Sequence, residues 1–166
     1  MEVSSFGAIA VGGWARDITF ETVHHSVILY DSNGAQLFAL QLPGESGMDG
    51  QAEDVAFDPA GNVIATGQVV DDDEFGDEML TSKIAPDGTV LWSVRHDASN
   101  DMFFNQTIGY SLLADATGSV YVGYKGVGAA GGDARIIKYD TDGTMLWDIP
   151  IAPIGSHLEL LQRADG

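Results

Sequence analysis

Three stretches of the chain repeat one pattern: YDSNGAQLFALQL (30–42), IAPDGTVLWSVRH (84–96) and YDTDGTMLWDIPI (139–151). Each holds Asn-Gly or Asp-Gly between two apolar runs, which is a strong short-range signal for a β-hairpin. Two marks recur at spacings of 54 and 55 residues, a turn glycine and an aromatic residue four positions later: Gly34, Gly88, Gly143, Phe38, Trp92 and Trp147. The spacing predicts an internal repeat of about 55 residues.

A second element recurs between these hairpins. It reads VAFDPAGNVIATG at 55–67, LLADATGSVYVG at 112–123 and, in part, LLQRADG at 160–166, while FGAIAVGG at 6–13 is its second half. The apolar runs are rich in Val, Ile and Tyr, which suit a pleated and half-buried surface. Each copy therefore carries four strand signals, and the chain is predicted to be an all-β domain over 1–166.

Four consecutive antiparallel strands in each copy predict a β-propeller-like blade. About twelve strands are expected, in three blades. The first copy supplies its second to fourth strands over 6–42, and the next two blades cover 53–95 and 107–150. A last inner strand at 157–163 is expected to complete the first blade, because such closure removes a free sheet edge.

Composition excludes several classes of function. The chain has 25 Asp and Glu against 7 Lys and Arg, a net charge of −18, so binding to nucleic acid or to an anionic membrane surface is disfavoured. No apolar run approaches the length of a membrane span, so no membrane insertion is expected. The N-terminal stretch lacks a basic region, so no signal peptide is expected. With no Cys, thiolate chemistry is excluded.

The strings PGESGMDGQAEDVAFDPAGNVIATG (43–67) and LTSKIAPDGTVLW (80–92), with RIIKYDTDGTMLW (135–147), resemble a bacterial repeat family named for its seven-bladed β-propeller. They are also similar to NHL and quinoprotein-like propeller repeats. The resemblance implies blades whose glycine turns and tryptophans are structural. It also implies an extracellular or cell-surface bacterial location. This chain departs from the pattern at Phe38, where a Trp is usual, and at Gly123, before which one residue is missing.

Three blades are fewer than the resemblance implies for a ring. Three alternatives remain open from the sequence. The chain is a segment of a longer propeller, or it pairs with a second copy as a homodimer that makes a six-bladed ring, or it forms a three-blade structure of its own. An open array leaves apolar flanks and a strand edge in water.

Longer loops are expected at one end of the strands and tight turns at the other. Binding residues usually lie on such loops. The densest acidic run, VVDDDEFGDEM at 69–79, falls in one of them, and hard cations such as calcium prefer clustered carboxylates. The candidate metal ligands are Asp71, Asp73, Glu74 and Asp77. A solvated acidic loop is the simpler interpretation of the same run.

Equivalent positions on the inner strands hold Asp54, Ser111 and Glu159, which are candidates for a polar ring along the axis, with His157 near its mouth. The alternative is that these side chains only satisfy backbone groups. No nucleophile–base pair or metal signature stands out. The favoured function is a non-catalytic binding or scaffold module that docks a protein or small molecule on the acidic long-loop face, without a cofactor other than calcium. The alternative is a propeller enzyme of hydrolase or lyase type with its site at the channel mouth.

Overall fold

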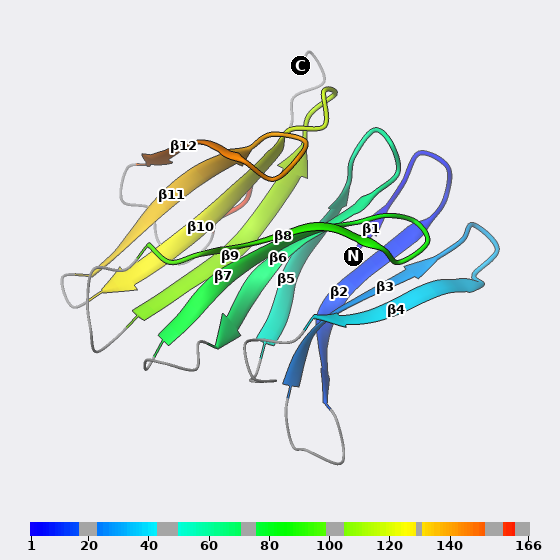
Figure 1. The fold of residues 1–166 in the computed structure, drawn as a ribbon, viewed down its shortest axis with the longest axis horizontal. Coiled ribbons are helices and arrows are strands. Elements are labelled where there is room, and N and C mark those ends of the chain that lie inside the picture. Colours follow the sequence, from blue (N-terminus) through cyan, green and yellow to red (C-terminus); the bar gives the residue numbers. More distant parts are fainter. Residues whose placement is uncertain are drawn as a thin grey trace.

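The computed structural model describes residues 1–16, 23–42, 50–70, 76–98, 105–128, 131–151 and 158–161. Across these ranges the chain forms twelve strands and no helix (Figure 1). The described ranges therefore hold no helix of the length and apolarity needed to cross a membrane. The strands are β1 (Glu2–Val3), β2 (Ile9–Arg16), β3 (Val23–Tyr30), β4 (Gln36–Leu42), β5 (Gly50–Phe57), β6 (Val63–Val70), β7 (Gly76–Ile84), β8 (Val90–His96), β9 (Asn105–Ala114), β10 (Val120–Gly128), β11 (Gly131–Tyr139) and β12 (Met145–Pro150).

The strands form three antiparallel meanders, called here unit 1 (β1–β4), unit 2 (β5–β8) and unit 3 (β9–β12). Unit 1 is a separate four-stranded sheet. Units 2 and 3 are joined because β7 and β9 pair in parallel at two positions, Gly76–Asn105 and Asp77–Gln106. Figure 1 shows the three units side by side in chain order. The predicted all-β fold of about twelve mostly antiparallel strands is confirmed.

Six tight turns follow one geometry. In the turn after β3, the Gly34 N–H donates to the Asp31 carbonyl at 3.0 Å, and Gly34 has a φ of 82°. This is a type I turn that ends in a left-handed glycine, and the register of β3 and β4 shifts beside it, between Leu29 and Tyr30. The hairpin predicted at Asn33-Gly34 is present, and its loop is longer than a two-residue turn. Asp31 explains the difference, since its Oδ1 accepts the backbone N–H groups of Asn33 and Ala35 and stabilises the longer turn.

Two hydrophobic cores hold the units together. The first lies between units 1 and 2, where Val27 and Leu29 of β3 pack with Val63 and Ile84. The second lies between units 2 and 3, where Ile64 and Met79 pack with residues of unit 3 that include Val120, Val122 and Ile137. Alternate residues along each strand point to opposite faces. Unit 2 therefore contributes one face to each core.

The repeat aromatics pack on the turn glycine of the next unit. Phe38 of unit 1 lies against Gly88, where an added Cβ would come 3.2 Å from the Phe38 Cβ. Trp92 of unit 2 covers Gly143, and its Nε1–H donates to the Thr141 carbonyl at 3.0 Å. An added Cβ at Gly143 would come 2.8 Å from the Trp92 ring, so only a glycine fits beneath that ring. The third aromatic, Trp147, is 37% exposed and has no further unit to pack on among the described residues, unlike Phe38 and Trp92.

The innermost strand position differs from the prediction at both ends of the chain. Residues 158–161 form no strand, and they lie against unit 3: the Leu160 N–H donates to the Ser111 Oγ at 2.9 Å. The short strand β1, which the sequence pattern did not predict, pairs with β2 as the inner strand of unit 1. The segment 158–161 therefore does not complete unit 1. The described residues form an open array and not a closed ring.

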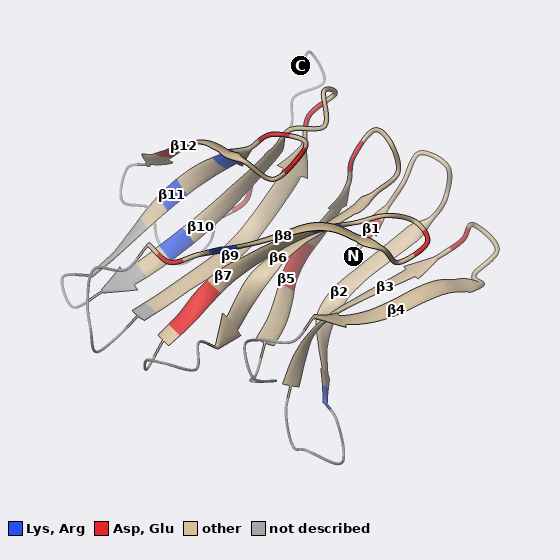
Figure 2. Cartoon of the chain, viewed as in Figure 1, with Lys and Arg blue, Asp and Glu red and all other residues tan. Residues whose placement is uncertain are grey.

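The charges are unevenly spread over the three units (Figure 2). Acidic residues occupy most of the tight turns, where Asp31, Asp58, Asp115 and Asp140 accept backbone N–H groups. The basic residues of unit 3 lie on its two middle strands, β10 and β11: Lys125, Arg135 and Lys138. Many of the acidic side chains thus have a local structural role in the turns.

Candidate functional site

The inner strands β5 and β9, together with Glu2 of β1 and residues 158–161, line a groove of about 470 Å³. It contains Asp54, Ser111 and Glu159, so the structure brings together three of the four residues predicted for an axial site. The fourth, His157, lies outside the described residues. Glu53 and Tyr110 also face this groove.

Asp54 and Ser111 link neighbouring units through the backbone. Both oxygens of Asp54 accept backbone N–H groups, Oδ2 from Leu112 of the next unit and Oδ1 from Val55, each at 2.9 Å. Ser111 makes the corresponding contact one repeat later, where its Oγ accepts the Leu160 N–H at 2.9 Å. The alternative that these side chains satisfy backbone groups therefore describes both of them.

The groove is electrostatically acidic. Burial raises the pKa of Asp54, the nearby N-terminal amine opposes the rise, and the charge of Glu159 adds to it. Burial also raises the pKa of Glu53, and burial together with the Glu53 charge raises the pKa of Tyr110. Carboxylates that crowd together disfavour each other's ionisation. The groove suits a cation or a hydrogen-bond donor better than an anion.

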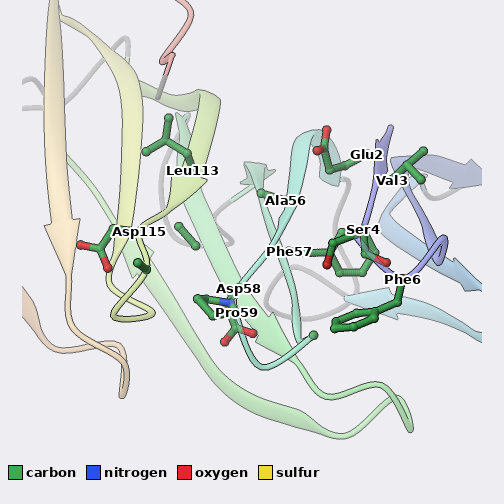
Figure 3. A pocket seen from close by; sticks show the side chains of 14 residues that line it. Glu2, Val3, Ser4, Phe6, Ala56, Phe57, Asp58, Pro59, Leu113 and Asp115 are labelled. Carbon is green, nitrogen blue, oxygen red and sulfur yellow. The ribbon is translucent and has the colours of Figure 1, made fainter. Parts of the chain in front are cut away.

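A second cavity, of about 410 Å³, continues from the groove toward the tight turns. The two cavities share Glu2, Ala56 and Leu113. Figure 3 shows this cavity with Glu2, Val3, Ser4 and Phe6 on one side and Leu113 and Asp115 on the other. Phe6 is 82% exposed at its rim. The axis of the array is therefore an open groove that runs past the inner strands of all three units.

Of the predicted metal ligands, only Asp77 is among the described residues; Asp71, Asp73 and Glu74 lie outside them. The Asp77 Oδ2 accepts a hydrogen bond from Gln106 Nε2 at 3.0 Å, beside the parallel pairing of β7 and β9. Burial raises the pKa of Asp77, and the Gln106 contact opposes the rise. Across the described ranges, no three His, Asp or Glu side chains gather closely enough to hold a metal ion. The calcium hypothesis for 71–77 stays a prediction.

A polar network that the sequence did not reveal joins unit 2 to unit 3. Tyr124 is fully buried, and its hydroxyl donates to Asp148 Oδ2 at 2.8 Å. Arg135 Nε donates to Asp148 Oδ1 at 3.0 Å, and His96 Nε2 lies 3.1 Å from the Tyr124 hydroxyl. Burial, followed by the contact with Asp148, raises the pKa of Tyr124, while burial lowers that of His96.

Alignment on the turn glycines shows that this network is not a requirement of the repeat. The equivalent positions at the interface of units 1 and 2 are Leu42, Gly67, Leu80 and Ser93. Leu42 and Leu80 belong to the apolar core there. The signal was present in the sequence as four polar residues at positions where the preceding interface has two leucines, a glycine and a serine, but only the structure shows that the four side chains meet.

Comparisons with known proteins give one distant structural likeness and no sequence match. No family model and no curated protein matches the chain. One solved structure that matches is a quinonprotein alcohol dehydrogenase-like protein from Bacteroides thetaiotaomicron, at 14% identity and a TM-score of 0.31. The match covers 89% of this chain and 44% of that protein, so the chain spans less than half the length of the protein it matches.

Proposed function

We propose that the chain is a non-catalytic binding or scaffold module, made of three β-propeller blades, which docks a basic partner on its long-loop face. The contacts of Asp54 and Ser111 carry the proposal. These polar groups in the axial groove accept backbone N–H groups of the next inner strand. The groove side chains then align the blades, and we assign docking to the long-loop face. The repeat resemblance supports a location at the bacterial surface or outside the cell.

The strand ends beside the long loops form a cross-linked base. Gln106 of β9 donates to Asp77 of β7, and Arg95 of β8 pairs with Glu78 of β7 at 3.4 Å. The network around Tyr124 ties β8 to β10 in the same region. Loops that start from a rigid base are the usual place for binding residues. Because the loop sequence at 71–74 is wholly acidic, the face favours a cationic segment of a protein.

The enzymatic alternative is less well supported by the same groove. A pair of carboxylates at the channel mouth needs at least one oxygen free to transfer a proton. Asp54 has both oxygens in backbone hydrogen bonds, and Glu159 is exposed. Burial raises the pKa of Asp54, which suits an acid–base residue, but the two backbone contacts oppose the rise. The geometry therefore favours docking over catalysis.

An oligolysine peptide is a direct probe of the loop face. Binding is measured by calorimetry at low ionic strength for two matched triple variants, each of which removes three negative charges. The loop variant carries Asp71→Asn, Asp73→Asn and Glu74→Gln. The groove variant carries Glu2→Gln, Glu53→Gln and Glu159→Gln. We expect the loop variant alone to weaken binding, by about tenfold, with the affinity of the unmodified chain falling as salt is added.

Equal weakening by the two variants would mean that only the net charge matters, and it would overturn docking at the loop face. Loss of binding in the groove variant alone would move the site to the axis. Far-UV circular dichroism of both variants provides the control for folding.

A further inference from the structure

Unit 1 and unit 3 each expose one sheet face whose equivalent is buried in the other two units. On unit 1 the face contains four side chains, which we call the open face of unit 1: Ile9, Val11, Ile28 and Tyr30. All four are partly exposed. Their equivalents in unit 2 are all 0% exposed: Val63, Ala65, Ser82 and Ile84. Their equivalents in unit 3 are 0–1% exposed: Val120, Val122, Ile137 and Tyr139. An apolar set that the repeat normally buries is thus in contact with water.

On unit 3 the exposed sheet face is the one opposite to that exposed on unit 1. It consists of the following side chains, which we call the open face of unit 3: Tyr121, Ile136, Lys138, Trp147 and Ile149. Trp147 and Ile149 are 37% and 46% exposed. In unit 2 the positions equivalent to Tyr121, Ile136 and Lys138 are 0–5% exposed: Ile64, Thr81 and Lys83. The first and last units therefore carry the two halves of the contact that the chain already makes twice.

Among the described residues, the turn glycine of unit 1 and the repeat aromatic of unit 3 each lack the partner that their equivalents have. Gly143 is buried beneath Trp92, and Gly88 is partly buried beneath Phe38. Gly34, the first in the series, is exposed, and apart from its two chain neighbours no described residue lies within 4 Å of the place where its Cβ would be. Trp147, the last aromatic, has no turn glycine beyond it in the described chain. One molecule thus offers an uncovered glycine at one end and a ring that fits it at the other.

Polar contacts repeat in the same way. Both Trp92 Nε1 and Lys83 Nζ point to the Thr141 carbonyl, two residues before Gly143, at 3.0 and 3.4 Å. Lys83 also pairs with Asp58 at 2.8 Å. Lys138 is the equivalent of Lys83, and its Nζ lies 3.7 Å from the Asp115 carboxylate. Trp147 and Lys138 therefore present two donors in the arrangement that meets a turn carbonyl, and the carbonyl two residues before Gly34 belongs to Ser32.

We propose that the open face of unit 3 binds the open face of unit 1 of a second copy of this chain. A second copy is the occupant because both complementary faces belong to one molecule. In a two-fold symmetric pair each copy covers its partner once, so that two identical contacts cover all four open faces and close six units into a ring. Trp147 then covers Gly34 of the partner subunit. This inference concerns assembly and does not depend on the binding role proposed above.

The segment 158–161 fits the same arrangement. Leu158 and Leu160 lie on Gly123, as Ala52 and Val55 of β5 lie on the equivalent Gly12. The segment thus occupies the place of the next inner strand. In unit 1 that strand is β1, which has only two residues, against eight in β5. In the pair, the segment extends the short inner strand of the partner's first unit.

Solution mass tests the proposal, by sedimentation equilibrium from low micromolar concentrations upward. We expect twice the chain mass of 17.6 kDa. Val11→Arg blocks the unit 1 face, and Trp147→Glu blocks the unit 3 face, so each variant alone is expected to be a monomer. Leu146→Glu is the matched control. Leu146 is 53% exposed, and its equivalent Leu91 is 51% exposed although unit 2 has neighbours on both sides, so this control should remain a dimer.

Mixing the two monomeric variants gives the decisive result. The unit 3 face of Val11→Arg and the unit 1 face of Trp147→Glu are both intact, so the mixture is expected to recover the dimer mass through one contact. A mixture that stays monomeric overturns the head-to-tail arrangement, as does a monomeric unmodified chain. Polymers that grow with concentration overturn closure into a pair. Circular dichroism checks folding, and Tyr30→Arg at the edge of the face replaces Val11→Arg if that variant unfolds.

Discussion

His25 is buried without a hydrogen-bond partner for either ring nitrogen among the described residues. It lies on the face of β3 that points to unit 2, where an added Cβ on Gly50 would come 3.3 Å from the His25 Cβ. Burial lowers the pKa of His25 to about 4. The equivalent residue in unit 2 is Met79, which is 0% exposed in an apolar core. A neutral histidine therefore occupies a position that the repeat fills with an apolar side chain.

This burial makes the stability of the fold depend on pH. The unfolded chain takes up a proton at His25 below about pH 6.5, whereas the folded chain does so only near pH 4, so stability is lost as the pH falls between these values. The loss amounts to about 3 kcal/mol. His25→Met should reduce this slope in urea unfolding measured from pH 7 to pH 4, leaving the smaller contribution of His96, whose pKa burial also lowers. His24→Gln, on the opposite face of β3, is the control and should retain the slope.

A His25→Met chain with an unchanged slope would show that other groups titrate in this window. The effect of Asp58 on stability can be distinguished from that of His25, because it appears at a lower pH. Burial raises the pKa of Asp58, but hydrogen bonds from Lys83 and Asn62 outweigh this and hold the pKa below its usual value. Its contribution to stability is therefore present above about pH 4 and lost at lower pH.

At the scale of elements, the outer strands β8 and β12 carry the same tryptophan in two different surroundings. Trp92 covers Gly143 and donates a hydrogen bond to Thr141, whereas Trp147 meets Tyr121 edge-on, with 5.9 Å between ring centroids, and stays 37% exposed. We expect Trp92→Ala to lower the free energy of unfolding by about 3 kcal/mol and Trp147→Ala by about 1 kcal/mol.

Both substitutions are compared in chains that also carry Val11→Arg, so that association does not contribute to the free energy measured by urea unfolding. Equal losses for the two would show that the next unit does not determine how much each tryptophan stabilises the fold. Trp92→Phe separates the hydrogen bond to Thr141 from the packing of the ring.

The strands themselves were predictable, because the alternation of apolar residues and the turn glycines are local signals. The turn geometry was not, since it depends on the Asp31 side chain and its hydrogen bonds to the backbone. The packing of residues 158–161 against unit 3 could not be predicted either. Alternation of apolar residues indicates a strand, but it does not indicate which sheet the segment joins. The Tyr124 network is hidden for a similar reason, because its four residues come from four different strands.

At the scale of the whole molecule, the net charge of −18 opposes compaction. We expect the melting temperature to rise as sodium chloride is added, because salt screens this repulsion. The calcium hypothesis for 71–77 predicts a further rise in calcium chloride at the same ionic strength, reversed by a chelator. Differential scanning calorimetry measures both effects. The same curve in the two salts at matched ionic strength would reject the cation site.

The linear order of the units has a consequence for cooperativity. The substantial contacts between units run from unit 1 to unit 2 and from unit 2 to unit 3. In an array of this kind, stability is roughly a sum of unit terms and nearest-neighbour terms. Either end unit can open while the other interface stays intact, but opening unit 2 breaks both interfaces. We therefore expect unfolding of a single chain to begin at an end unit.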